Sequence, residues 1–308
     1  MTRPDPDSFL SGDGGDVTDP WRRAKRTAGE LAYGAIDAVT GTRLRAARLA
    51  RTTRAPLDVL VLGVYRDAAL LTDTLSALRS NRHHVRFALG SMGTAHGDLR
   101  EHTVAEHLTG GKFQNLNRLL DAAGGAPDWT IVIDDDVRLP RAFLDRFLAV
   151  CEAFELDLAQ PAQTLRSHSA WKVTRRRPAS LVRVTRFVEI GPVTAFGRRA
   201  AAELLPFPDL RFGWGLDLHW AALAGRNGWR LGIVDALPVR HESALVGTTY
   251  SRDDAVEEAA SFLTDRPYLP SARAGEVLAT HRRARLTCGS SSSAPTCALV
   301  ARSATGRR

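Results

Sequence analysis

The segment WTIVI at residues 129–133 is followed at once by three aspartates, Asp134, Asp135 and Asp136. The run is short, apolar and rich in β-branched residues, which predicts a strand buried on both faces. Carboxylates need partners in a dry core, so three in a row indicate that the strand ends there. In open α/β sheets, ligands bind at this carboxyl end of the strands. The segment therefore predicts an enzyme site that holds a divalent cation against a phosphorylated substrate.

Strand-like and helix-like segments alternate over the middle of the chain. This alternation predicts an α/β domain with a mainly parallel, Rossmann-like sheet flanked by helices. The expected strands cover residues 58–65, 85–89, 129–133, 156–159, 171–175, 181–188 and 231–235. The expected helices cover residues 68–79, 112–123, 140–154, 198–205 and 216–224.

Charge divides the 308 residues into four regions. Residues 1–20 carry one Arg and five Asp and are expected to form a disordered acidic tail. Residues 21–54 carry nine basic and two acidic residues and predict a basic helical extension, interrupted near Gly41. Residues 55–270 are nearly neutral and are expected to form one catalytic domain, followed by a mostly disordered, basic, Ser-rich tail at 271–308. The net charge of +8 lies in the flanks, which argues against a nucleic-acid enzyme with a basic groove.

Composition also bears on location. No apolar run approaches the roughly 18 residues of a membrane span, and the first residues lack the pattern of a signal peptide. Three cysteines without a CxxC pair argue against a zinc ribbon or a disulfide scaffold and favour a reducing compartment. We expect a cytoplasmic protein. Its helix at 21–54 either contacts an anionic inner membrane face peripherally or packs loosely on the domain as a solvated helix.

The side chains of the acidic triplet are predicted to point to two different sides of the chain. Side chains alternate along an extended chain, so Asp134 and Asp136 face one way and Asp135 another. Two carboxylates with open positions suit Mn²⁺ or Mg²⁺ that also binds phosphate oxygens. The alternative is an Asp-rich turn in which one acid caps the helix beginning near Pro140.

The segment FGWGLDLHW at residues 212–220 is the second candidate motif. Trp214 offers a flat apolar face to a sugar, and the Asp217 carboxylate is a candidate general base. Gly215 and Glu189 complete the expected acceptor and sugar-binding set. In the alternative interpretation, Asp217 caps helix 216–224 and the tryptophans lie in the core.

Two strand ends supply further candidates. His241 follows the last expected strand, within VDALPVRHE at 234–242, and could converge on the aspartates as a third metal ligand. Tyr65 ends the first strand and could stack on a nucleotide, with Arg66 beside it. The alternatives are an ordinary hydrogen-bonded histidine and a tyrosine used for packing.

Over roughly residues 55–250 the chain resembles the GT-A-fold glycosyltransferases, which use nucleotide-diphosphate sugars. GKFQNLN at 111–117, followed by the acidic strand end, resembles the family-2 pattern of a GK…LN helix leading into a DxD strand. WGLD at 214–217 is similar to the WGxE/D acceptor motif of inverting galactosyltransferase-like enzymes, and RHES at 240–243 to their metal-binding segment. The chain also resembles an uncharacterised, plant-rich family of GT-A-like proteins.

The resemblance implies a GT-A-like single domain and a Mn²⁺ or Mg²⁺ ion held by the DxD pair, with Asp136 as the direct ligand. GSMG at 90–93 departs from the pattern, because many family-2 enzymes carry a base-reading aspartate there. The base of the donor is therefore left open. The donor-binding residues implied are Tyr65, Arg66, Lys112, Asn117, Asp134 and Asp135.

The leading hypothesis is a metal-dependent glycosyltransferase that moves a sugar from a nucleotide-diphosphate donor to a saccharide, lipid-linked or other hydroxyl acceptor, with inversion. One alternative is a nucleotidyltransferase, although VYRD at 64–67 is a poor match to the Gly-rich basic loop expected there. Another is a sugar- or nucleotide-binding module with a decayed site. A third is a nucleic-acid-binding protein that uses its basic flanks.

Overall fold

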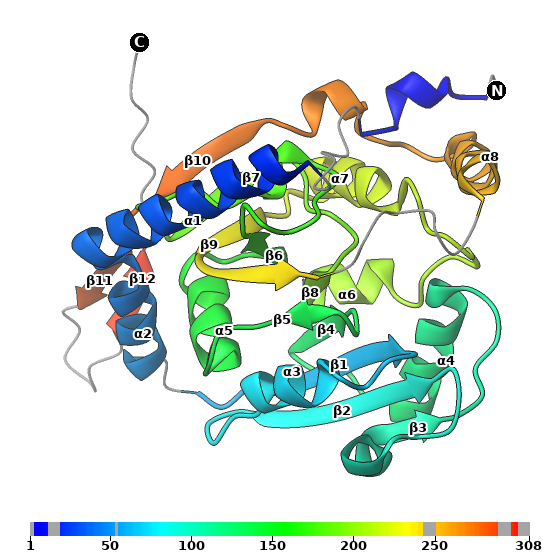
Figure 1. The fold of residues 1–308 in the computed structure, drawn as a ribbon, viewed down its shortest axis with the longest axis horizontal. Helices are drawn as coiled ribbons and strands as arrows, with labels where there is room; N and C mark the ends of the chain where they lie inside the picture. Colours follow the sequence, from blue (N-terminus) through cyan, green and yellow to red (C-terminus); the bar gives the residue numbers. More distant parts are fainter. Residues whose placement is uncertain (1–2, 12–18, 53–54, 243–250, 289–296, 301–308) are drawn as a thin grey trace.

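The computed structural model describes residues 3–11, 19–52, 55–242, 251–288 and 297–300. One large sheet runs through this part of the chain, with strand order β10-β7-β9-β6-β8-β4-β1-β2-β3 and β5 paired to β9 (Figure 1). Its strands are β1 (Asp58–Tyr65), β2 (His84–Ser91), β3 (Thr103–Ala105), β4 (Trp129–Ile133), β5 (Val137–Arg138), β6 (Leu158–Gln163), β7 (Val182–Thr185), β8 (Val193–Gly197), β9 (Leu231–His241) and β10 (Val277–His281). A separate hairpin joins β11 (Arg285–Cys288) and β12 (Cys297–Val300).

All strands along this path except β7 and β8 point the same way, which confirms the expected α/β fold with a mainly parallel sheet. β8 lies antiparallel between β4 and β6, and β7 lies antiparallel between β9 and β10. The five residues of β4 are all buried, as the continuous apolar run predicts for a central strand.

Helices cover both faces of the sheet. Successive residues of a strand point to opposite faces, so Ile131 joins one core cluster and Val132 the other. The first cluster is covered by α3 (Leu71–Leu78), α5 (Phe143–Ala153) and α2 (Thr42–Thr52). The second is covered by α4 (Lys112–Ala123), α6 (Arg198–Leu204), α7 (Leu216–Asn227) and α8 (Arg252–Leu263).

Several element boundaries differ from the expectation. α5 begins at Phe143, not Pro140, because Ala142 adopts a left-handed conformation with φ 49° just before it. Residues 171–175 form no strand but contain a 3-10 turn at Lys172–Thr174. β9 continues to His241, well beyond the expected end at residue 235, and so carries that histidine within a strand.

The terminal regions also differ from the expectation. Residues 277–281 pair with β7, so the prediction of a mostly disordered tail from residue 271 is wrong for this segment. Residues 1–20 were expected to be disordered, but Pro6–Ser8 form a 3-10 turn and Phe9 is buried in the second cluster. The domain therefore draws on both flanks of the expected range 55–270.

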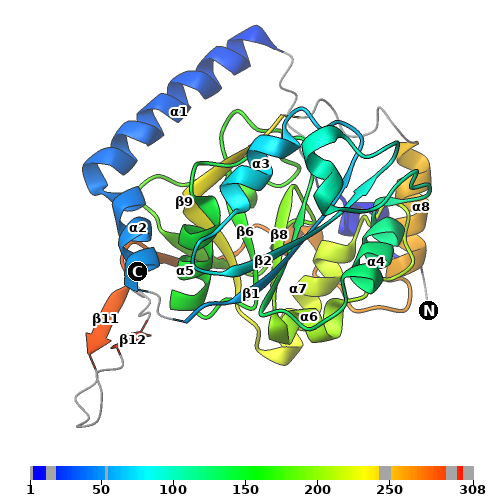
Figure 2. The ribbon, with the colours of Figure 1, turned by 90° about the horizontal axis from the view of Figure 1, so that it is seen from below.

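The basic extension forms two helices, α1 (Pro20–Thr40) and α2, which are separated at Gly41. α2 packs Ala46, Leu49 and Ala50 into the core. α1 runs along an outer edge of the molecule, where Asp37 is its only buried residue (Figure 2). Among the described residues, no helix combines the length and apolarity needed to cross a bilayer.

Candidate active site

Three potential metal ligands meet at the carboxyl end of β4. One ligand atom each from Asp134, Asp136 and His241 lies within 4.8 Å of the others. The two-residue strand β5 makes this possible, because Val137 pairs with His241 across an antiparallel ribbon. Nε2 of His241 lies 3.1 Å from Oδ1 of Asp136, and the N–H of Glu242 donates to the carbonyl of Asp136 at 2.9 Å. The structure thus brings together the three residues that the sequence proposed as metal ligands.

Asp134 is held between a helix and a loop. Its backbone N–H donates to the carbonyl of Pro192 at 2.9 Å, and its Oδ1 forms an ion pair with the ammonium of Lys112 at the start of α4. A Cβ built on Gly191 would lie only 2.9 Å from Oδ2 of Asp134. Glycine at 191 therefore lets the loop after Glu189 approach the Asp134 carboxylate closely.

Asp135 lies on the other side of the chain. Its Oδ2 accepts hydrogen bonds from the backbone N–H groups of Arg66 and Asp67, at 2.8 and 3.1 Å. Burial raises the pKa of Asp135 and the charges of its two aspartate neighbours add to this, although the backbone bonds oppose it. The residue thereby fixes the turn after β1, and its donor-binding role stays a prediction.

Two other expected donor-binding residues make contacts within the domain. Tyr65 is 2% exposed, and its hydroxyl lies 2.9 Å from Oγ1 of Thr103, which leaves its ring no free face for a base. Asn117 exchanges two hydrogen bonds with the backbone of Phe207, both at 2.8 Å. The side chain of Arg66 is exposed, with a guanidinium nitrogen 3.6 Å from the sulfur of Met92.

A second histidine lies beside the group formed by Asp134, Asp136 and His241. The ring centroids of His168 and His241 are 6.5 Å apart. Burial lowers the pKa of His168, and the charge of His241 lowers it further. Burial alone would also lower the pKa of His241, but the hydrogen bond and charge of Asp136, with the charges of Asp134 and Glu189, leave it raised. His168 was not singled out in the sequence, because it belongs to no motif.

Two buried acids with raised pKa values continue the site from His241: Glu189, which interacts with His241, and Asp217, which interacts with Glu189. Burial raises the pKa of Glu189 to about 8, and the charge of Asp217 contributes to this, while His241 opposes it. Burial raises the pKa of Asp217 to about 7, against hydrogen bonds from Leu218, Ile190 and the Trp171 side chain. Nε2 of Gln163 donates to Glu189 at 2.9 Å. Glu189 therefore interacts both with His241, one of the three potential metal ligands, and with Asp217.

The loop before α7 positions Asp217. Gly215 precedes the helix with φ 86°, a left-handed conformation that few other residues adopt. Oε1 and Oε2 of Glu258, from α8, accept the backbone N–H groups of Arg211, Phe212 and Gly213 at 2.6–3.0 Å. Trp214 is half-buried against the second core cluster, and Trp220 is in the core. Glu258 is a site-supporting residue that sequence reasoning missed, since it lies far from the motif that it holds.

A buried ion pair supports the segment at residues 171–175. The guanidinium of Arg183 and the carboxylate of Asp235 are both fully buried and form two hydrogen bonds, at 2.8 and 2.9 Å. Arg183 also donates to the carbonyls of Val173 and Arg175, at 2.6 and 2.8 Å. These bonds hold the segment that carries Trp171 and Thr174, whose side chains hydrogen-bond to Asp217 and Glu189 respectively.

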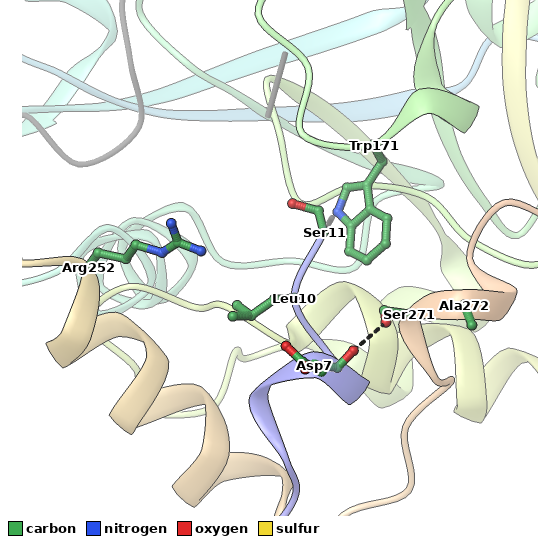
Figure 3. Close-up of a pocket in the computed structure, with 7 residues that line it drawn as sticks. All are labelled: Asp7, Leu10, Ser11, Trp171, Arg252, Ser271 and Ala272. Atoms are coloured by element: carbon green, nitrogen blue, oxygen red, sulfur yellow. Dashed lines mark hydrogen bonds between the residues drawn. The ribbon is translucent and has the colours of Figure 1, made fainter. Parts of the chain in front are cut away.

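A cavity of about 500 Å³ lies beside Trp171 (Figure 3). The indole forms one wall, and Ser271 donates to the carbonyl of Asp7 at 3.0 Å on the opposite side. The lining is mixed polar and apolar and comes from distant parts of the chain: Asp7, Leu10, Ser11, Trp171, Arg252, Ser271 and Ala272. Because Trp171 contacts both the cavity and Asp217, the cavity is adjacent to the candidate base.

Comparisons with known proteins give matches among solved structures only. No family model matches the chain, and no curated protein matches it. The chain is similar to GalNAc-T7, solved with UDP, GalNAc and Mn²⁺, at 13% identity and a TM-score of 0.47, over 65% of this chain and 46% of that one. It is also similar to residues 1–349 of S. aureus TarS in complex with UDP-GlcNAc, at 15% identity and a TM-score of 0.43, over 61% of this chain and 62% of that one. The chain thus spans less than two thirds of either protein, and the likeness is one of fold.

Proposed function

We propose that the chain is a metal-dependent glycosyltransferase of the GT-A type, which moves a sugar from a nucleotide-diphosphate donor to an acceptor hydroxyl. The proposal rests on one observation, which is that two groups of residues lie together in one site. The first is the set Asp134, Asp136 and His241, and the second is the buried carboxyl of Asp217 with a pKa of about 7. Glu189 links them through its charge interactions with His241 and Asp217.

The first group fits Mn²⁺ or Mg²⁺ by its chemistry. Carboxylate oxygens suit both ions, and imidazole is acceptable to the transition metal. When bound, the cation would neutralise the charge that develops on a diphosphate leaving group. Lys112, which pairs with Asp134, would provide a second positive charge near the same phosphates. Asp134, Asp136 and His241 would be the residues that hold the ion.

Asp217 would act as the general base. It would take the proton from the acceptor hydroxyl as that oxygen attacks the anomeric carbon from the face opposite the diphosphate, which inverts the configuration. A base works best when its pKa lies near the working pH, and burial brings the pKa of Asp217 to that range. The cavity beside Trp171 supports an acceptor of saccharide or other polyhydroxyl type, since indole faces and polar groups together suit sugars.

Replacement of the base tests the proposal directly. Asp217→Asn should lower kcat by about 100-fold or more, because the amide cannot accept the proton. Stabilisation of the variant by Mn²⁺ and the donor should persist, since the metal-binding residues are intact. The measurement is release of nucleoside diphosphate from a panel of nucleotide sugars, with thermal unfolding in parallel. Asp121→Asn, an exposed acid on α4, is the control and should behave as wild type.

Three other outcomes would contradict the proposed base or favour another function. Full turnover in Asp217→Asn would remove this residue from the role of base. Release of pyrophosphate from a nucleoside triphosphate and a sugar phosphate, without release of nucleoside diphosphate from any nucleotide sugar, would indicate a nucleotidyltransferase. Stabilisation by a nucleotide sugar without any turnover in the wild type would indicate a binding module with a decayed site.

A further inference from the structure

Helix α1 has its polar and apolar faces reversed relative to an ordinary surface helix. Glu30, Tyr33 and Asp37 are on the side that meets the rest of the molecule, and Asp37 is the only buried residue of the helix. A surface helix of a globular protein normally turns its apolar stripe to the core and its charges to water. α1 does the opposite, so its contact with the domain does not explain its apolar residues.

Polar bonds hold the inner face of α1. The guanidinium of Arg176, itself 3% exposed, forms ion pairs with Glu30 and with Asp37. Glu30 also accepts the N–H of Leu165 at 2.9 Å, and Asp37 accepts that of Ala179 at 2.8 Å. Both acidic residues of the segment 21–54 therefore bind partners on the domain side of α1. These specific contacts fix the orientation of the helix.

The outer face of α1 is apolar along its whole length. Trp21 is 78% exposed, Leu31 73% and Val39 89%, and alanines at helical spacing fill the positions between them. Trp21 and Val39 are 18 positions apart, so the stripe extends for about 27 Å. Leu44, at 64% exposure, adds a further apolar side chain in α2. Large apolar residues gathered in this way mark an interaction surface.

The charges beside the stripe indicate what covers it. Every exposed charged residue of α1 and α2 is basic: Arg22, Arg23, Lys25, Arg43, Arg48 and Arg51. Two copies of this chain packed through the stripe would bring these like charges together, which disfavours a dimer. An apolar face with Trp at one end, together with exposed basic residues on the same two helices, matches the boundary of an anionic bilayer, where lysine and arginine reach the headgroups.

We propose that the outer face of α1, with the exposed basic residues of α2, docks the protein on a membrane surface that carries anionic lipids. The helix would lie in the plane of the interface with Trp21, Leu31 and Val39 in the acyl boundary. The segment held by Arg176 also carries Trp171, so docking would bring the Trp171 side of the site near the membrane. The inference does not depend on the reaction proposed above.

The test is flotation of the full-length protein with phosphatidylcholine vesicles in which about one third of the lipid is phosphatidylglycerol. We expect the wild type to float with these vesicles and not with pure phosphatidylcholine, and to be released by salt. Leu31→Ser with Val39→Ser should reduce the bound fraction about tenfold or more, because two side chains leave the acyl boundary. The matched control is Leu278→Ser with Val104→Ser, an exposed Leu and an exposed Val elsewhere, which should bind as wild type.

Circular dichroism and thermal unfolding should be unchanged in the Leu31/Val39 variant, since neither side chain is buried. Three results would overturn the proposal. One is equal flotation with neutral vesicles, and another is equal loss of binding in both double variants. The third is absence of flotation together with a concentration-dependent dimer that the Leu31/Val39 variant abolishes.

Discussion

At the scale of single residues, the site contains two acids that burial has made weak. The pKa of Asp217 is raised to about 7 and that of Glu189 to about 8, in both cases first by burial. Such acids disfavour the folded state when they are ionised, so a useful base costs the protein stability. The same carboxyl group therefore connects the proposed chemistry with the pH dependence of folding.

The contribution of Asp217 to the stability of the protein should fall as pH rises from about 4 to about 7. In this window the native state keeps a proton on Asp217 that the unfolded chain has lost, because the pKa is about 7 folded and 3.8 unfolded. Asp217→Asn should therefore raise the free energy of unfolding by about 1–3 kcal/mol at pH 8 and by much less at pH 4. Urea unfolding at both pH values measures this. A gain that is equal at the two pH values would contradict the raised pKa.

The sequence could predict residues whose role is local, and less well those whose role depends on distant partners. Asp134 and Asp136 directly follow the apolar run of β4, so the sequence alone places them at a strand end, and His241 joins them through the pairing of β5 with β9. Tyr65 and Asn117 belong to motif positions too, but their exposure depends on Thr103 and Phe207, which no motif contains. The pKa of Asp217 likewise depends on burial by segments far along the chain.

At the scale of elements, α8 supports the loop that precedes α7. The Glu258 carboxylate accepts three successive backbone N–H groups, at residues 211–213, and thereby sets the entry to the helix that carries Asp217. N–H groups that lose their acceptor in a partly buried loop are costly, so this carboxylate is expected to matter for both stability and the alignment of the proposed base.

Glu258→Ala should lower the free energy of unfolding by about 1–3 kcal/mol, because three N–H groups lose their acceptor. It should also lower kcat more than it raises the KM of the donor, since the metal-binding residues lie on other elements. Denaturant unfolding and donor-saturation kinetics provide the two readouts. The neighbouring Glu257→Ala removes only an exposed pair with Arg3 and should leave both unchanged. Similar losses in the two variants would show that the charge of α8, and not the loop contact, is responsible.

Elements with a strong local pattern were predicted well, and short elements were not. β4 is five consecutive apolar residues, so its burial follows from its composition. β8 and β10 are also five residues long, but VTAFG contains glycine and VLATH ends in a histidine, which hides them from pattern arguments. Their strand geometry comes from pairing with β4, β6 and β7, a contact that only the folded chain supplies.

At the scale of the whole molecule, the folded unit extends past the boundary expected at residue 270. β10 closes one edge of the sheet against β7, and the N–H of Leu181 donates to the carbonyl of His281 at 2.8 Å. Ala274 and His281 are buried, so this C-terminal segment contributes to the packing of the domain.

Truncation after residue 270 should therefore destabilise the protein strongly, because it removes an edge strand and exposes β7. Truncation after residue 284 keeps β10 and Ala284, which packs on the first core cluster, and should unfold at nearly the same temperature as the full chain. Thermal unfolding and solubility of the two truncated proteins measure the difference. A stable protein ending at residue 270 would mean that β10 is dispensable.

The ribbon between β5 and β9 makes ion binding a reporter of strand alignment. Asp136 and His241 are far apart in the sequence and are neighbours only because Val137 pairs with His241. A slip of one residue would present Arg240 or Glu242 in place of the imidazole and turn the side chains to the opposite face. A spectroscopic signal from a bound paramagnetic ion would therefore appear during refolding only when these two strands have found their native register.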